Sequence, residues 1–275
     1  MNAKNSSPAA DTKRAAQILT ENIARLAVKP MRLMEVCGTH TMSIFKAGIR
    51  QLLPANIELV SGPGCPVCVS ANDFLDTAIA YAHLPETIIA TFGDMLKIPG
   101  THSSLLNAKT TGADVRVVYS PLDALDLALA NGEKRVIFLA VGFETTAPVI
   151  AATIQTAQKM GVTNLYFLTA HKTVPPALTA LLTKAGKKID GFLLPGHVCA
   201  ITGLKDFEFL AADFQTPAVV TGFEPLDILE GIYLLAQEVT QGSAALLNQY
   251  SRVVKPAGNQ AALSIMREVF RSAAA

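Results

Sequence analysis

The chain has 275 residues, of which 50% are hydrophobic and 16% charged, and its formal net charge at pH 7 is +1. This length suffices for two domains with cores of their own, and the composition excludes an intrinsically disordered chain. A charge so close to zero gives no reason to expect binding to nucleic acid or to an anionic membrane. The longest apolar run, residues 136–141, is too short to cross a bilayer, and the first residues carry no apolar signal core. We therefore expect a cytoplasmic protein.

One rhythm repeats along the chain: a short apolar strand, a turn rich in glycine or proline, and an amphipathic helix. After a mobile tail at residues 1–11, a first helix is predicted over residues 12–28, where apolar residues recur at helical spacing. Strands and helices that alternate in this way are typical of βαβ units with parallel sheets. Eight strands are predicted, at residues 32–36, 57–60, 87–91, 115–119, 135–141, 164–169, 191–194 and 218–221.

The pattern predicts an α/β fold with two Rossmann-like lobes, each a mainly parallel sheet of about four strands flanked by helices. We place the first lobe at residues 12–125 and the second at residues 126–250. A last helix, within residues 251–275, is expected to return to the first lobe. Loops beyond the carboxyl ends of parallel strands line the ligand crevice of such sheets, and most of the unusual residues fall in these loops.

Two of the four cysteines lie in the stretch S-G-P-G-C-P-V-C, residues 61–68. Cysteines separated by two residues can form a disulfide or share a metal ion. Because a helix is predicted at residues 74–81, the pair Cys65 and Cys68 is expected near a helix amino terminus, which stabilises thiolates and favours redox chemistry. The alternative is a pair of inert, buried thiols, and for Cys199 a buried, inert thiol is the favoured interpretation.

The fourth cysteine, Cys37, belongs to C-G-T-H, at the end of the first predicted strand. A thiolate and an imidazole three residues apart can face one point and are common ligands of soft metals. His40 could instead handle protons for the thiolate, or be purely structural. Together with C-P-V-C, the motif gives C-x-x-H…C-x-x-C, a pattern that could hold zinc.

Further acidic residues and histidines follow apolar strands, where they could orient thiols, move protons or contribute to the binding of a cofactor or partner. For each of them, capping of the following helix is the alternative. Glycine-rich phosphate-binding motifs and a G-x-S-x-G elbow are missing, which disfavours a nucleotide enzyme and a serine hydrolase. The candidate residues are Asp94, Glu144, His171, His197 and Glu224.

Seven motifs occur in one order along the chain: M-E-V-C-G-T-H, S-G-P-G-C-P-V-C-V, T-F-G-D-M, P-G-T-H-S-S-L, V-G-F-E-T-T-A-P, L-P-G-H-V and T-G-F-E-P-L-D. In these motifs the chain closely resembles the HypD family of [NiFe]-hydrogenase maturation factors. The resemblance extends from about residue 12 to residue 271. Several of the motifs are long and unusual, so chance agreement is excluded.

The resemblance implies a scaffold on which the Fe(CN)2CO fragment of the hydrogenase active site is assembled. It implies that Cys37 is the iron ligand, shared with a HypC-type small chaperone, and that His40 is its close neighbour. Cys65 and Cys68 would be a redox-active dithiol, which makes the chain a maturation scaffold more than a turnover enzyme. A HypE-type cyanide donor would be the second partner, and neither nucleic acid nor a membrane would be one.

The sequence departs from the family pattern in one respect. Family members continue into a region with four more cysteines, which bind a [4Fe-4S] cluster, whereas the only further cysteine here is Cys199. We therefore expect a truncated form or a family member without its cluster. Two other hypotheses use the same cysteines: a thiol–disulfide oxidoreductase that needs only Cys65 and Cys68, and a structural zinc site formed by both motifs.

Overall fold

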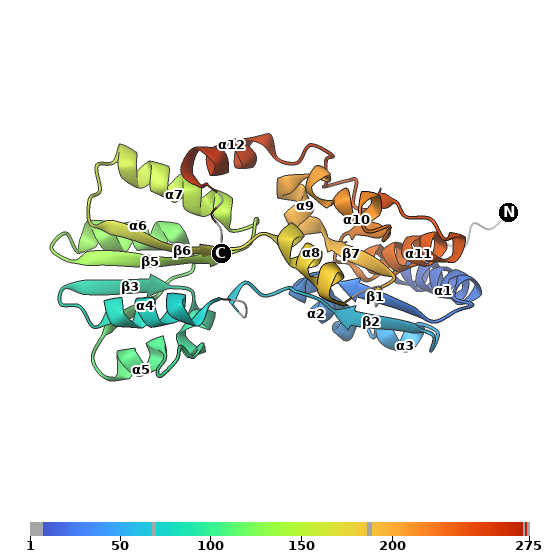
Figure 1. The fold of residues 1–275 in the computed structure, drawn as a ribbon, viewed down its shortest axis with the longest axis horizontal. Helices are drawn as coiled ribbons and strands as arrows, with labels where there is room; N and C mark the ends of the chain where they lie inside the picture. Colours follow the sequence, from blue (N-terminus) through green and yellow to red (C-terminus); the bar gives the residue numbers. More distant parts are fainter. Residues whose placement is uncertain (1–7, 68–69, 186–188, 272, 274–275) are drawn as a thin grey trace. The chain divides into compact units, whose positions relative to one another are not determined.

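The computed structural model describes residues 8–67, 70–185, 189–271 and 273, and it has the mixed α/β fold that the sequence predicts (Figure 1). All eight predicted strands are present at nearly the predicted positions, and a short ninth strand, β9, follows them. The strands are β1 (Met31–Glu35), β2 (Ile57–Ser61), β3 (Thr87–Thr91), β4 (Asp114–Val117), β5 (Arg135–Gly142), β6 (Leu165–His171), β7 (Gly191–Pro195), β8 (Ala218–Thr221) and β9 (Leu246–Asn248).

Helices connect most of these strands. Among the described residues, 3-10 helices at Gly93–Lys97 and Lys205–Phe207 supplement the α-helices. The α-helices are α1 (Pro8–Leu26), α2 (Gly38–Lys46), α3 (Ile49–Leu52), α4 (Asn72–Ala82), α5 (Leu105–Thr110), α6 (Pro121–Ala130), α7 (Ala147–Lys159), α8 (Val174–Ala185), α9 (Gly196–Thr202), α10 (Phe209–Ala212), α11 (Pro225–Gln241) and α12 (Gln260–Val269).

The amino-terminal tail predicted at residues 1–11 falls mostly outside the described residues, which begin at Pro8. From Pro8 onward the chain is already helical, so the first helix starts earlier than predicted. Within the described residues, no helix combines the length and the apolar character that a membrane span requires.

The strands form two parallel sheets, of five and four strands, as predicted for an α/β fold with two lobes. Their orders are β2-β1-β7-β8-β9 and β4-β3-β5-β6. The chain divides accordingly into unit 1, residues 1–64 and 174–259, and unit 2, residues 65–173 and 260–275.

This division differs from the contiguous lobes predicted at residues 12–125 and 126–250. Strand β1 pairs with the distant strand β7, in the register Leu33↔Gly191, so the first two strands join the last three. Hydrophobic periodicity identifies a strand from its neighbours in sequence, but it carries no information about which strands pair across the chain.

The last helix belongs to unit 2. Helix α12 packs against α7, and the Gln155 side-chain amide donates a hydrogen bond to Glu268 Oε2 at 2.7 Å. Phe270, directly after α12, packs against a cluster that contains Ile88 of the predicted first lobe and Ile150 of the predicted second lobe. The predicted return to a lobe at residues 12–125 has no counterpart in this division, because unit 2 combines residues of both predicted lobes.

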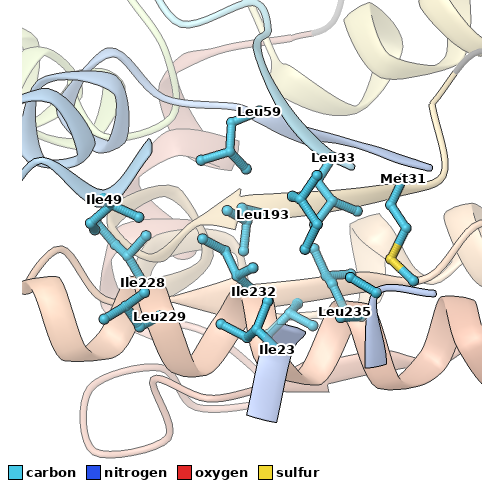
Figure 2. Packing of buried hydrophobic residues seen from close by; sticks show 14 of the residues in the cluster. Ile23, Met31, Leu33, Ile49, Leu59, Leu193, Ile228, Leu229, Ile232 and Leu235 are labelled. Atoms are coloured by element: carbon cyan, nitrogen blue, oxygen red, sulfur yellow. The ribbon is translucent and has the colours of Figure 1, made fainter. Parts of the chain in front are cut away.

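The core of unit 1 lies between one face of its sheet and the long helices α1 and α11. Leu33 of β1 and Leu193 of β7 are fully buried against Ile232 and Leu235 of α11. Figure 2 shows these side chains together with Ile23 of α1, which reaches the same cluster. Because side chains alternate along a strand, one face of β1 contributes to this core. The residues beyond its carboxyl end belong to the site.

Unit 2 buries both faces of its sheet. Phe138 and Ala140 of β5 belong to the apolar cluster on one face, and Ile137 and Leu139 belong to the cluster on the other. Such a strand reads as a continuous apolar run rather than an alternating one, which is typical of central strands in parallel sheets. The run at 136–141 is therefore a core strand.

Candidate functional site

In the sheet of unit 1, β1 and β7 are parallel neighbours, and the strands that follow them lie on opposite sides of this pair. β1 is followed by β2 on one side, and β7 is followed by β8 on the other. Ligands of open α/β sheets bind beyond the carboxyl ends of the strands at such a topological switch point. Cys37 follows β1 and His197 follows β7, so both residues flank this point.

Cys37 occupies the N-cap position of α2, with φ −164° and ψ 130°. Its side chain makes no capping hydrogen bond, and the residue is half-buried. The first amides of a helix have no partner within the helix, and together with the helix dipole they favour negative charge at this end. The Cys37 sulfur is therefore placed where a thiolate and the ligands of a bound metal can be stabilised.

The S-G-P-G segment packs against the start of α2. The Gly62 amide donates a hydrogen bond to the Glu35 carbonyl oxygen at 2.8 Å. A Cβ atom on Gly64 would lie 2.6 Å from the Gly38 nitrogen, closer than real Cβ atoms approach, and 3.1 Å from the Cys37 carbonyl carbon, which is tighter than most real contacts. The glycines of this motif thus let the end of β2 pass directly beside the backbone of Cys37.

His40, on the first turn of α2, is fully buried. Its Nε2 atom lies 2.9 Å from the carbonyl oxygen of Gly222 and 3.0 Å from Thr221 Oγ1. Burial lowers the pKa of the imidazole to about 4, so the ring is neutral at physiological pH. Its other nitrogen, Nδ1, is buried and has no hydrogen-bond partner among the described residues.

A group of rings surrounds His40 at the turn after β8. The Phe223 ring stacks on His40 at 4.5 Å and on His197 at 3.9 Å between ring centroids. Tyr250, beyond β9, meets Phe223 edge-on at 6.4 Å. His197 is exposed, and partial burial lowers the pKa of its imidazole. Two predicted site residues, His40 and His197, thus share one aromatic neighbour.

Glu224 stands at the start of α11, but the carboxylate that forms an ion pair at this turn is that of Asp227. Glu224 is the exposed N-cap residue of α11, without a side-chain capping bond. Asp227 is buried and binds Arg252 through two hydrogen bonds of 2.8 and 2.6 Å. Burial alone would raise the pKa of Asp227, but the hydrogen bonds from Arg252 and Gln249 outweigh it and hold that pKa below its ordinary value.

In unit 2, Cys65 packs partly buried against an apolar cluster that contains Val141 and Met95. Its predicted position at a helix amino terminus is wrong, because α4 begins only at Asn72. Pro63 and Pro66 lack backbone N–H groups, and the two glycines have low helix propensity, so residues 62–66 are unsuited to a helix start. Cys68 lies outside the described residues.

The other three candidates belong to unit 2 and do not form one cluster. Asp94 is exposed in the 3-10 helix after β3, and Glu144 is buried after β5. His171 ends β6, where its ring meets that of Phe270, the residue after α12, edge-on at 5.0 Å, and burial lowers the pKa of His171. The five residues predicted to support the thiols are therefore divided between the two units.

Comparison with known proteins agrees with this set of motifs. The family model described as "HypD: Hydrogenase formation hypA family" matches residues 14–275. The hydrogenase maturation factor HypD of Escherichia coli K12 is 48% identical over 249 residues, which are 90% of this chain and 67% of that protein. The factor of the same name from Rhodobacter capsulatus is 44% identical over 92% of this chain and 67% of its own length.

A third relative, from Methanocaldococcus jannaschii, is named a putative hydrogenase expression/formation protein. It is 43% identical over 254 residues, 92% of this chain and 70% of its own length. The chain belongs to the HypD family. It matches about two thirds of the length of these HypD relatives.

The residues described here do not fit the [4Fe-4S] cluster that the HypD resemblance implies. Cys199 is fully buried in α9. Across the described part of the chain, no three His, Cys, Asp or Glu residues come together as ligands of a metal ion would. The zinc and oxidoreductase hypotheses both need Cys68, so they remain predictions.

Sequence reasoning missed one charged residue beside the HypD cysteine motif. Glu35, two residues before Cys37, is fully buried, and its Oε1 atom accepts hydrogen bonds from Arg50 at 3.1 Å and from Ser61 at 2.9 Å. A carboxylate at the end of β1, just before the cysteine motif, was the available signal. No comparable signal marked Phe223, because a phenylalanine after a strand is usually a core residue.

Proposed function

We propose that this protein acts in hydrogenase maturation, in the cytoplasm, as a scaffold on which the Fe(CN)2CO fragment is assembled before it is passed on. Membership of the HypD family supports the general role, because relatives in that family are named hydrogenase maturation factors. The iron fragment is the cargo of this scaffold, and Cys37 is its ligand.

The position of Cys37 carries the proposal. It is the half-buried N-cap residue at the switch point of a parallel sheet, and its side chain makes no capping bond. Low-spin iron(II) with cyanide and carbonyl ligands is a soft centre that favours thiolate. A scaffold that must release its cargo needs a site that solvent and partners can reach, which a fully buried thiol such as Cys199 would not provide.

We assign Cys65 and Cys68 the role of a redox dithiol for the assembly reactions. Gly64, the residue before Cys65, packs against the backbone of Cys37. This contact holds the start of the dithiol segment beside the proposed iron ligand. Two cysteines at this spacing can form a disulfide with each other, so such a pair can alternate between dithiol and disulfide.

The proposed partners are a HypC-type chaperone, which supplies the second thiolate to the iron, and a HypE-type cyanide donor. Helix α2, which begins at Cys37, exposes Met42 and Phe45, with 51% and 77% of their surface accessible. Large exposed apolar side chains beside a functional residue are typical of a protein–protein contact. We place the chaperone on this face of α2.

The test is to purify the protein together with its small chaperone from cells that make the iron fragment, and to measure iron and the cyanide and carbonyl infrared bands. Cys37→Ala should lose both the iron and the bands. Cys199→Ala is the matched control, since it removes a thiol of the same unit that is fully buried. Bands of normal intensity in the Cys37→Ala complex would show that the iron has another ligand.

A further inference from the structure

We propose that the turn at residues 221–223 fixes His40 in one tautomer, with its hydrogen on Nε2, so that Nδ1 offers a lone pair to the ligand held at Cys37. Thr221, Gly222 and Phe223 are then positioning residues of the site. The nature of the ligand rests on the function proposed above, whereas the tautomer follows from unit 1 alone.

The first step is the contact between Nε2 and the Gly222 carbonyl oxygen, at 2.9 Å. A carbonyl oxygen has no hydrogen to give, so the hydrogen of this bond belongs to Nε2. The Thr221 hydroxyl, 3.0 Å from the same nitrogen, can accept as well as donate and does not oppose this assignment. In a neutral ring, a hydrogen on Nε2 leaves Nδ1 without one.

The second step is that the ring stays neutral. His40 is fully buried, and burial lowers its pKa to about 4 despite the hydrogen bonds at Nε2. Of the charged groups around it, His197 lowers the pKa further and Asp227 raises it. The doubly protonated ring is therefore excluded near neutral pH, and Nδ1 acts as an acceptor.

The third step concerns the surroundings of the His40 Nδ1 atom. It is buried and has no hydrogen-bond partner among the described residues, a state that is unfavourable in a folded protein. His40 is the third residue of α2, and Cys37 is its N-cap. These two positions lie within the first turn of the same helix, where the side chain of each can reach the backbone of the other. The lone pair therefore favours a ligand at Cys37 that brings a metal ion or a hydrogen-bond donor.

The turn that holds His40 is itself fixed by its surroundings. A Cβ atom on Gly222 would collide with the carboxylate of Asp227, which Arg252 holds in place, so a glycine is favoured there. The Gly222 amide donates to the Gln249 side-chain oxygen at 3.2 Å, and Arg252 holds Asp227 with two hydrogen bonds. The direction of the Gly222 carbonyl is thus set by three side chains, and with it the hydrogen position on His40.

The direct test is long-range ¹H–¹⁵N NMR of the metal-free protein with ¹⁵N-labelled histidine. We expect His40 to show a hydrogen-bearing Nε2 and a bare Nδ1 down to about pH 5. A hydrogen on Nδ1, or a doubly protonated ring at pH 6, overturns the inference. Arg252→Lys, which loosens the turn, should raise the minor tautomer to a measurable share.

Arg116→Lys is the matched control for the NMR test, because Arg116 makes the same two-bond pair with Asp114 in unit 2. It should leave the His40 signals unchanged. An equal change in both variants, or none in Arg252→Lys, would contradict a positioning role for the turn.

Two substitutions separate the nitrogens in the iron assay. His40→Gln keeps a side-chain N–H that can reach Gly222 but lacks an acceptor at the Nδ1 position, and we expect at least a tenfold loss of bound iron. His40→Asn places an oxygen near Nδ1 and should retain more iron than His40→Gln. Full iron in a folded His40→Gln protein contradicts the inference, whereas absence of iron from the wild type contradicts only the proposed function and leaves the NMR result to decide.

Discussion

Gly64 lies against Gly38, since a Cβ atom at position 64 would stand 2.6 Å from the Gly38 amide nitrogen. The contact joins the end of the β2 segment to the first residue of α2, directly after Cys37. Because the opposing atoms are backbone, they cannot move aside as a flexible side chain can. The glycine of S-G-P-G-C is therefore required for the placement of Cys37.

Gly64→Ala should lower the free energy of unfolding by about 1–3 kcal/mol, the usual cost of overpacking, and should displace Cys37. Chemical denaturation measures the first effect and the iron content of the chaperone complex the second. Gly38→Ala is the matched control, because its Cβ would meet only Gly64 O at an ordinary 3.7 Å. Equal stability of the two variants would show that the close approach is not required.

The ion pair between the buried Glu35 and the partly exposed Arg50 should be important for the stability of unit 1. Arg50→Met leaves the buried Glu35 carboxylate without its cation and should cost about 1–2 kcal/mol, less than for a fully buried pair because water screens the exposed Arg50. Glu35→Gln removes the charge, so the double variant should be more stable than Arg50→Met alone. A double-mutant cycle by urea unfolding measures this coupling, and a coupling energy of zero would contradict the role of the pair.

The stability of the protein should fall between about pH 6.5 and pH 4 because of His40. The pKa of His40 is about 4 in the folded state and the ordinary 6.5 in the unfolded state. Between these two values only the unfolded chain binds the proton. The shift corresponds to about 3 kcal/mol, present above pH 6.5 and lost as the pH falls to 4.

The measurement is the pH dependence of the free energy of unfolding in the wild type and in His40→Gln. The other titrating groups, including His171 and His197, cancel in the difference. We expect the wild type to have the steeper slope between pH 4 and 6.5. Parallel curves would show that His40 does not keep a low pKa in the folded protein.

Phe45→Ser should weaken binding of the small chaperone at least tenfold, because a central aromatic side chain often contributes more than 1.4 kcal/mol to an interface. Isothermal titration with the purified chaperone measures the dissociation constant. Tyr119→Ser is the control, since Tyr119 of unit 2 is even more exposed, at 91%. An equal loss in both variants would argue against a specific contact at α2.

The sequence was sufficient to predict the fold class, the eight longer strands and the family, because each depends on local patterns. Strand β9 was missed, since three residues are too few to show a period. The pairing of β1 with β7 joins segments far apart in the chain, which a local pattern cannot indicate. The interleaved units follow from that one pairing.

Local reasoning was less successful at the site. It placed Cys37 and His40 correctly on a strand-to-helix turn, because glycine, cysteine and histidine after an apolar strand are a distinctive combination. It placed Cys65 at a helix start that lies further on, at Asn72. It could not find Phe223 or Arg252, whose importance comes from contacts with residues distant in sequence.

The central claim, that Cys37 is the iron ligand, is tested most directly by alkylation of the thiols in the complex with and without the iron fragment, followed by mass spectrometry. We predict that Cys37 is modified in the iron-free protein and protected when the fragment is bound. Cys199, which is fully buried, should resist modification in both states of the folded protein. Modification of Cys37 to the same extent with and without iron would contradict the account.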